Sequence, residues 1–256
     1  MTSLHFLDPN PSGGPAVLLL HGLGADGTSW ILQMPALNEA GFRPVAPDVP
    51  GFGSSPYDGA GWNVRRVAAQ MADLLEELGC GPAHILGLSM GGVIAQQFAL
   101  DFPQFTRKLV LVSTFSVLRP QGLKGWVYFT RRAAAILILG MNAQAQVVAR
   151  HIFPNPQDEE LRAMYLASVA RANPRAYRKA MLSMGTFDSR NRLGEIKAPT
   201  LVITGSEDGT IAPERQKILA EGISSARQVI IPQAGHAVSV DQAQRFNQEL
   251  LDFLME

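Results

Sequence analysis

The chain has 256 residues, and its 22 lysine and arginine residues balance 22 aspartate and glutamate residues. This length suits one large α/β domain, and the zero net charge gives no sign of a nucleic-acid or anionic-membrane partner. A lone cysteine, Cys80, forms no internal disulfide and favours a reducing compartment. There is no signal-like N-terminus, and the apolar run 133–141 is too short to span a bilayer. We therefore expect a cytoplasmic protein with no membrane span.

Short apolar runs recur along the chain and are typical of buried β-strands. They cover residues 16–20, 43–47, 83–87, 108–113, 199–204 and 228–232. Most are continuous rather than alternating, which favours a parallel sheet covered on both faces. Segments with helical spacing lie between them, such as Val64–Leu78, and Gln242–Leu254 follows the last run. The alternation predicts an α/β fold with a doubly wound, mostly parallel sheet.

A serine stands between two glycines where the run 83–87 gives way to a helix-compatible segment, in Gly87-Leu88-Ser89-Met90-Gly91. Gly-x-Ser-x-Gly at a strand-to-helix junction is typical of a nucleophile elbow. The glycines let strand and helix approach closely, and the helix N-terminus offers free N–H groups to an oxyanion. The simpler alternative is a serine that only caps the helix.

An acid and a histidine follow the last two predicted strands. Asp208 comes after the run 199–204, and His236 comes after the run 228–232. Because the carboxyl ends of parallel strands share one sheet edge, both side chains are expected at the edge that carries Ser89. The chain order Ser, Asp, His is that of α/β-hydrolases and differs from the two other well-known serine triads.

The motifs resemble those of the α/β-hydrolase family over nearly the whole chain. His21-Gly22-Leu23-Gly24 is similar to the family's oxyanion loop, residues 48–55 to its D-x-P-G-x-G-x-S loop, and residues 193–200 to the return from a cap domain. The Gly-Leu-Ser-Met-Gly-Gly elbow most resembles the small carboxylesterase, 3-oxoadipate enol-lactonase and cofactor-free perhydrolase group. Only about twenty residues precede His21, so the first antiparallel strand is expected to be short or absent.

The alternation of strands and helices stops between residues 117 and 190, where helix-forming segments dominate. The resemblance implies a helical cap there, over the carboxyl edge of the sheet where open α/β folds bind ligands. The expected organisation is a first part of the core over 1–116, the cap over 117–190 and a second part of the core over 191–256.

The resemblance also implies a catalytic triad, with Ser89 as nucleophile, His236 as general base and Asp208 as the group that orients the imidazole. The backbone N–H groups of Leu23 and Met90 would form the oxyanion hole. No metal or organic cofactor is required. The substrate pocket is expected to contain Trp126, Phe129, Ile211 and Val238.

A dinucleotide-binding fingerprint competes for some of these residues. Residues 22–27 fit G-x-G-x-x-G after a strand, and Asp48 follows about twenty residues later. Another tight glycine loop follows Asp48, however, and NAD binding would leave the Ser89, Asp208 and His236 positions as coincidences. We expect Asp48 to organise its own loop.

The sequence predicts a hydrolase of carboxylic esters with small to medium apolar acyl groups, acting on a small-molecule ester or lactone. A lactone hydrolase, such as an enol-lactonase, is the alternative because it uses the same triad. A ligand receptor on the same fold and a cofactor-free perhydrolase are further alternatives. With a neutral imidazole as base, activity should fall as the pH drops through about 6–7.

Overall fold

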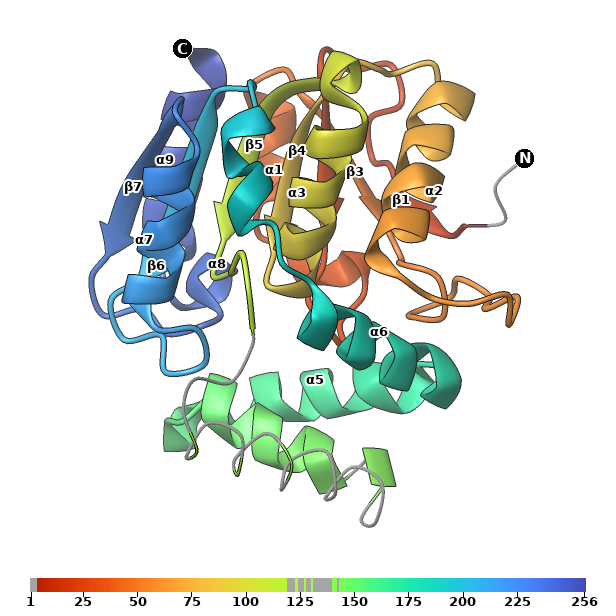
Figure 1. Ribbon diagram of the computed structural model, residues 1–256, viewed down its shortest axis with the longest axis vertical. Coiled ribbons are helices and arrows are strands. Elements are labelled where there is room, and N and C mark those ends of the chain that lie inside the picture. Colours follow the sequence, from red (N-terminus) through yellow and green to blue (C-terminus); the bar gives the residue numbers. More distant parts are fainter. Residues whose placement is uncertain (1–3, 119–122, 124–126, 128–129, 131–139, 142) are drawn as a thin grey trace.

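The computed structural model describes residues 4–118, 123, 127, 130, 140–141 and 143–256. Its centre is a seven-stranded sheet in the order β1-β3-β2-β4-β5-β6-β7 (Figure 1). The antiparallel pair is β1 with β3, and the remaining pairs of this sheet are parallel. The strands are β1 (Phe6–Leu7), β2 (Ala16–Leu20), β3 (Arg43–Pro47), β4 (Ala83–Leu88), β5 (Thr106–Val112), β6 (Thr200–Gly205) and β7 (Ala226–Ile231).

Helices cover both faces of the sheet, which explains why its strands are apolar on both sides. Leu18 and Leu20 of β2 pack into one core cluster, whereas Val17 and Leu19 pack into the other. The first cluster includes side chains of α2 (Val64–Glu77), α3 (Met90–Asp101) and α7 (Pro213–Gly222); the second includes side chains of α1 (Met34–Glu39) and α9 (Ala243–Met255). Shorter elements are η1 (Gly27–Trp30), η2 (Pro103–Phe105) and α8 (Val238–Asp241).

The register brings the carboxyl ends of the parallel strands to one edge. Leu20 of β2 pairs with Gly87 of β4, and Gly205 of β6 pairs with Ile231 of β7. The loops after β2, β4, β6 and β7 therefore leave the sheet at the same side, and these loops carry the predicted site residues.

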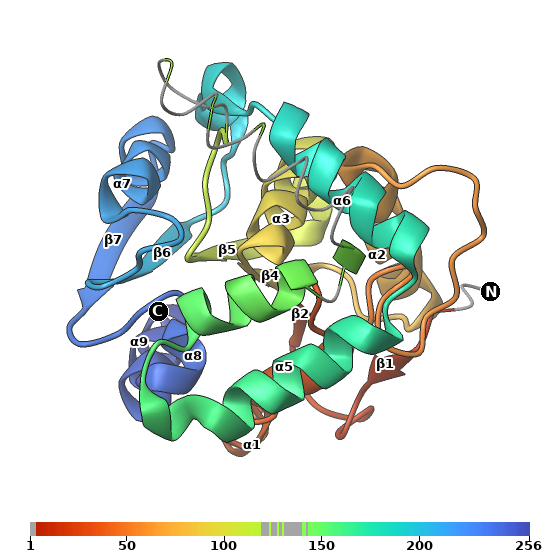
Figure 2. The same ribbon diagram turned by 90° about the horizontal axis from the view of Figure 1, so that it is seen from below.

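A group of helices separates β5 from β6. We call residues 143–152, α5 (Glu159–Arg171) and α6 (Pro174–Thr186) the β5–β6 helices; η3 (Pro156–Asp158) and η4 (Arg190–Glu195) flank α5 and α6. Figure 1 shows them below the sheet, and Figure 2 shows α5 in front of β2 and α6 in front of α2 and α3. Val169 of α5 and Tyr177 of α6 are buried in the same cluster as α2 and α3.

The structure confirms the predicted doubly wound, mostly parallel sheet, with strand ends shifted by at most two residues. The antiparallel strand expected to be short or absent is β1, which spans 2 residues. Trp30 is buried and contacts Phe246 of α9. Within the part of the chain that the structure describes, no helix is both long and apolar enough to cross a membrane.

Candidate active site

Ser89 occupies a left-handed turn between β4 and α3, with φ 54° and ψ −111°. Such a φ is unfavourable for a residue with a side chain, so the surrounding structure must hold it. The Ser89 N–H donates to the carbonyl oxygen of Val112 at 2.9 Å, and its carbonyl oxygen accepts from Thr114 Oγ1 at 2.8 Å. Both ends of the turn are thus fixed to the end of β5, and the Ser89 side chain is half-buried.

The glycines of the elbow are required by close backbone approaches. A Cβ at Gly87 would collide with the backbone carbonyl of Gly91, and a Cβ at Gly91 would collide with the carbonyl oxygen of Leu20 in β2. The tight junction of strand and helix, and its packing against β2, therefore depend on the absence of side chains at these two positions.

Asp208 and His236 are in contact and almost fully buried. The His236 Nδ1 atom lies 3.1 Å and 3.0 Å from the two carboxylate oxygens of Asp208. The carboxylate Oδ1 also accepts from the backbone N–H groups of Thr210 at 2.9 Å and Ile211 at 2.8 Å. Gln216 Nε2 donates to Oδ2 at 3.1 Å. An acceptor facing Nδ1 assigns the ring proton to that nitrogen and leaves the Nε2 lone pair free to take a proton.

The loops that carry this pair are packed against each other. The Glu207 N–H donates to the carbonyl oxygen of Ala234 at 2.9 Å, and a Cβ at Gly205 would collide with that same carbonyl oxygen. The N–H of Gly235 donates to Asp241 Oδ2 at 2.8 Å, and burial raises the pKa of Asp241. Asp208 and His236 are thus brought together, while Ser89 lies on the same edge of the sheet at the end of β4.

The loop after β2 stands against the elbow. A Cβ at Gly22 would lie 3.8 Å from the Cβ of Ser89. The Ala25 N–H donates to the Gly22 carbonyl oxygen at 3.2 Å, closing a turn in which Gly24 has φ +80°. Leu23 lies inside this turn, and Met90 is the first residue of α3, whose N–H has no partner within the helix. These are the two predicted oxyanion-hole residues. After this prediction, we call residues 22–26 the oxyanion loop.

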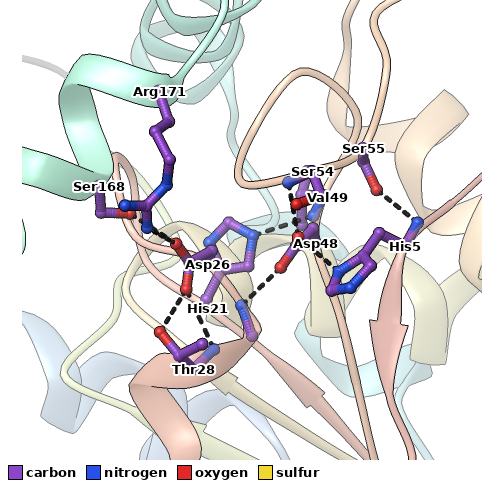
Figure 3. Close-up of polar contacts among 11 residues, drawn as sticks. His5, His21, Asp26, Thr28, Asp48, Val49, Ser54, Ser55, Ser168 and Arg171 are labelled. Atoms are coloured by element: carbon purple, nitrogen blue, oxygen red, sulfur yellow. Dashed lines mark hydrogen bonds and ion pairs between the residues drawn. The ribbon is translucent and has the colours of Figure 1, made fainter.

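His21 fixes the start of the oxyanion loop. Its ring is buried; Nδ1 lies 2.8 Å from the Gly22 carbonyl oxygen, and Nε2 accepts from the Val49 N–H at 2.9 Å (Figure 3). Because one nitrogen donates and the other accepts, the imidazole is neutral, and burial lowers its pKa. His21 therefore binds the loop backbone on both sides of its ring.

Asp48 organises its own loop, as predicted. Its Oδ1 accepts from the Gly27 N–H and its Oδ2 from the Ser54 N–H, both at 2.8 Å, and His5 Nδ1 lies 2.8 Å from Oδ2 (Figure 3). This buried carboxylate has no oxygen turned to solvent for a ribose hydroxyl, which argues against the dinucleotide alternative.

Asp26, at the end of the oxyanion loop, has no role in the sequence-based predictions. It is 5% exposed and interacts with Thr28 of η1 and with Ser168 and Arg171 of α5 (Figure 3). Burial opposes its ionisation, but hydrogen bonds from Thr28, Arg171 and Ser168 lower the pKa of Asp26 to about 2. In the sequence, Ser168 and Arg171 are three residues apart and therefore share one face of a helix, which was the feature that could have indicated a common partner.

The predicted pocket residues have different positions. Trp126 and Phe129 lie outside the described residues. Ile211 is buried in the α2 and α3 cluster, next to Asp208, and Val238 is buried in the α1 and α9 cluster, two residues after His236. A separate cavity of about 430 Å³ is lined by Tyr57, Asp58, Gly59, Asn173, Pro174, Arg175 and Arg178, and none of these was predicted for the site. Among the described residues, no cluster of histidine, cysteine and carboxylate side chains is placed to hold a metal ion.

Known proteins share both the sequence pattern and the fold. A provisionally named carbamate hydrolase, RutD of Variovorax paradoxus (strain S110), is 34% identical over 98% of this chain and 96% of its own length. A 2-hydroxy-6-oxo-6-phenylhexa-2,4-dienoate hydrolase of Burkholderia cepacia is 31% identical over 94% of this chain and 88% of its own. Among solved structures, a thermophilic esterase from Thermogutta terrifontis superposes with a TM-score of 0.86 at 30% identity, covering 98% of this chain and 93% of that chain.

The sequence pattern of one family, described as the alpha/beta hydrolase fold, matches residues 15–243. This match covers the elbow, the oxyanion loop and the loops of Asp208 and His236, and the names of the relatives support hydrolase activity. The resemblance inferred from the motifs is thereby confirmed, and the chain belongs to the α/β-hydrolase family.

Proposed function

We propose that this protein is a serine hydrolase that cleaves carboxylic esters of small to medium apolar acyl groups. The observation that supports it most is the contact of His236 Nδ1 with both oxygens of buried Asp208, at the sheet edge where the strained turn presents Ser89. A serine becomes a strong nucleophile when an oriented imidazole takes its proton.

The reaction consists of two acyl transfers. The Ser89 hydroxyl attacks the carbonyl carbon while its proton passes to His236 Nε2, and the oxyanion accepts hydrogen bonds from the N–H groups of Leu23 and Met90. The imidazolium, stabilised by Asp208, then protonates the departing alcohol. Water attacks the acyl-enzyme by the same route and releases the acid. Neither a metal nor an organic cofactor takes part.

The part of the chain between residues 117 and 190 is proposed to act as a cap, and Trp126, Phe129, Ile211 and Val238 to line the pocket. The support is the position of the β5–β6 helices below the sheet, with α5 in front of β2 (Figures 1 and 2). An apolar pocket should favour longer acyl chains until it is full, at up to about 0.8 kcal/mol per buried methylene.

Two other substrate classes use the same parts. Carbamates form the second candidate, because the relative named for carbamate hydrolysis is 34% identical over nearly the whole chain. Lactones are esters whose leaving alcohol stays attached, so the same triad opens them. A small molecule is the substrate in each case, and the single Cys80 fits the cytoplasm as the proposed location.

The deciding experiment measures hydrolysis of p-nitrophenyl acetate, butyrate and octanoate, several lactones and an aryl carbamate by wild type and Ser89→Ala. We expect ester turnover whose kcat falls by more than about 10⁴-fold in Ser89→Ala, because the nucleophile is lost. Ser224→Ala, at an exposed serine before β7, is the matched control and should keep full activity.

Faster turnover of lactones or of the carbamate, with the same loss in Ser89→Ala, would replace the ester proposal by that substrate class. If wild type exceeds Ser89→Ala on none of the three classes and a fluorophosphonate leaves Ser89 unlabelled, the proposed hydrolase is wrong.

A further inference from the structure

The carboxylate of Asp26 connects the oxyanion loop to two different parts of the fold. Its Oδ1 accepts from the Thr28 N–H at 3.1 Å and from the Thr28 hydroxyl, at the start of η1. Its Oδ2 accepts from Ser168 Oγ at 2.9 Å and from Arg171 Nη2 at 2.6 Å, both on α5 (Figure 3). One oxygen thus caps η1, which follows the loop, and the other binds the β5–β6 helices.

Two more contacts join α5 to the same loop. Tyr165 Oη donates to the carbonyl oxygen of Leu23 at 3.3 Å, which is long for such a bond. A Cβ at Gly24 would lie 2.6 Å from Cγ2 of Val169, so the α5 side chain packs directly on the loop backbone. The α5 helix therefore contacts the oxyanion loop at Leu23, Gly24 and Asp26.

The core holds the opposite side of this loop. The Gly22 carbonyl accepts from the His21 ring and from the Ala25 N–H, and it belongs to the same peptide group as the Leu23 N–H. In a trans peptide the carbonyl and the N–H point in opposite directions. The direction of the Leu23 N–H is consequently set by two supports, His21 from the core and α5 from the far side.

Charge adds a second reason for the contact with Arg171. Asp26 follows Leu23 by three residues in the chain. A buried negative charge in this loop would make an oxyanion bound at the Leu23 N–H less stable. The Arg171 guanidinium forms an ion pair with that carboxylate and offsets its charge. The Arg171 side chain itself is 55% exposed.

We propose that Arg171 and Ser168, assisted by Tyr165, are positioning residues that hold the Leu23 N–H in the oxyanion hole by fixing Asp26 from α5. This inference rests on the proposed function, because only a reaction with a developing oxyanion uses the hole. In this proposal α5 helps to position the oxyanion hole, in addition to any role in covering the substrate.

The test compares Arg171→Met with wild type. Methionine keeps an apolar stem and removes the donor and the charge. We expect kcat for p-nitrophenyl butyrate to fall about tenfold while KM changes less than about twofold, because the oxyanion exists only after the substrate has bound. Arg171→Lys, which keeps a cation near Asp26, should recover most of the loss.

Arg65→Met is the matched control. Arg65 of α2 forms an ion pair with the mostly buried Asp101 of α3 at 3.0 Å, and this pair includes no residue of α5 or of the oxyanion loop. Both variants lose one arginine–aspartate pair, so a general effect on folding would lower kcat in both. Hydrogen–deuterium exchange of the segment 21–27 gives a second readout that requires no turnover, and it should be faster in Arg171→Met only.

The outcomes separate the two proposals. If wild type is active, a kcat of Arg171→Met equal to that of Arg65→Met overturns the inference and leaves the proposed function standing. If wild type hydrolyses none of the substrates, the proposed function fails and exchange decides: faster exchange of 21–27 in Arg171→Met supports the positioning contact, and equal exchange overturns it.

Discussion

The hydrogen-bond donors around Asp208 all depend on its being a carboxylate. Two backbone N–H groups bind Oδ1, while Gln216 binds Oδ2 and the His236 ring faces both oxygens. An amide at this position has one oxygen and one NH2 group, so it would direct a donor either at the backbone N–H groups or at the ring. The ring avoids that clash of donors by moving its proton to Nε2.

Asp208→Asn should therefore lower kcat by on the order of 10⁴-fold, since the imidazole would hold its proton on the nitrogen that must accept one. KM should change little. The measurement is kcat and KM for p-nitrophenyl butyrate. Glu207→Gln removes the neighbouring, exposed carboxylate and should be neutral; a kcat loss in Asp208→Asn no greater than in this control would contradict the assigned role.

At the scale of elements, the approach of α3 to β2 sets the position of the elbow. Gly91→Ala would drive a Cβ into the carbonyl oxygen of Leu20, in a buried region without space for either backbone to move. We expect a loss of about 3 kcal/mol in the free energy of unfolding.

Urea unfolding measures this loss. Gly194→Ala is the matched control, because a Cβ at Gly194 meets nothing within 4 Å. Equal midpoints for Gly91→Ala and Gly194→Ala would show that the elbow tolerates a side chain.

The strands of the sheet were predictable because parallel strands buried on both faces leave long apolar runs in the sequence. β2 and β3 match their predicted bounds, Ala16–Leu20 and Arg43–Pro47. β1 has only 2 residues, both half-buried, and is defined by its pairing with β3 rather than by any pattern of its own.

The positions of Ser89, Asp208 and His236 follow from strand order, because each stands in the loop after a recognisable strand. The contacts of Asp26 do not follow from it. Its partners Ser168 and Arg171 are 142 and 145 residues away, and only the packing of α5 on the loop brings them together. Helical periodicity shows which residues share a face, but not which loop that face meets.

At the scale of the whole molecule, buried histidines make the stability of the fold depend on pH. His84 of β4 packs edge-on against Phe42, and its Nδ1 is buried without a partner. Burial, with help from Lys108 and Arg107, lowers the pKa of His84 to about 4. The unfolded chain binds this proton near pH 6.5, whereas the folded protein binds it only near pH 4. Stability is therefore unaffected above pH 6.5 and decreases as the pH falls toward 4.

We expect His84 to account for a loss on the order of 2 kcal/mol in unfolding free energy between pH 6.5 and 4. His84→Phe fills a similar volume without titrating and should reduce that pH dependence, as measured by urea unfolding at several pH values. His151→Phe, at an exposed histidine, is the control. An unchanged pH dependence in His84→Phe would show that the ring is protonated as easily in the fold as outside it.

The shared carboxylate of Asp26 also limits how this enzyme can be recombined with its relatives. Exchanging the β5–β6 helices for helices without a serine and an arginine at positions 168 and 171 would leave a buried anion beside the oxyanion loop. A chimaera designed to change substrate range would lose turnover for a reason unrelated to its new pocket. Grafts should therefore keep the serine and arginine of α5, or replace Asp26 together with them.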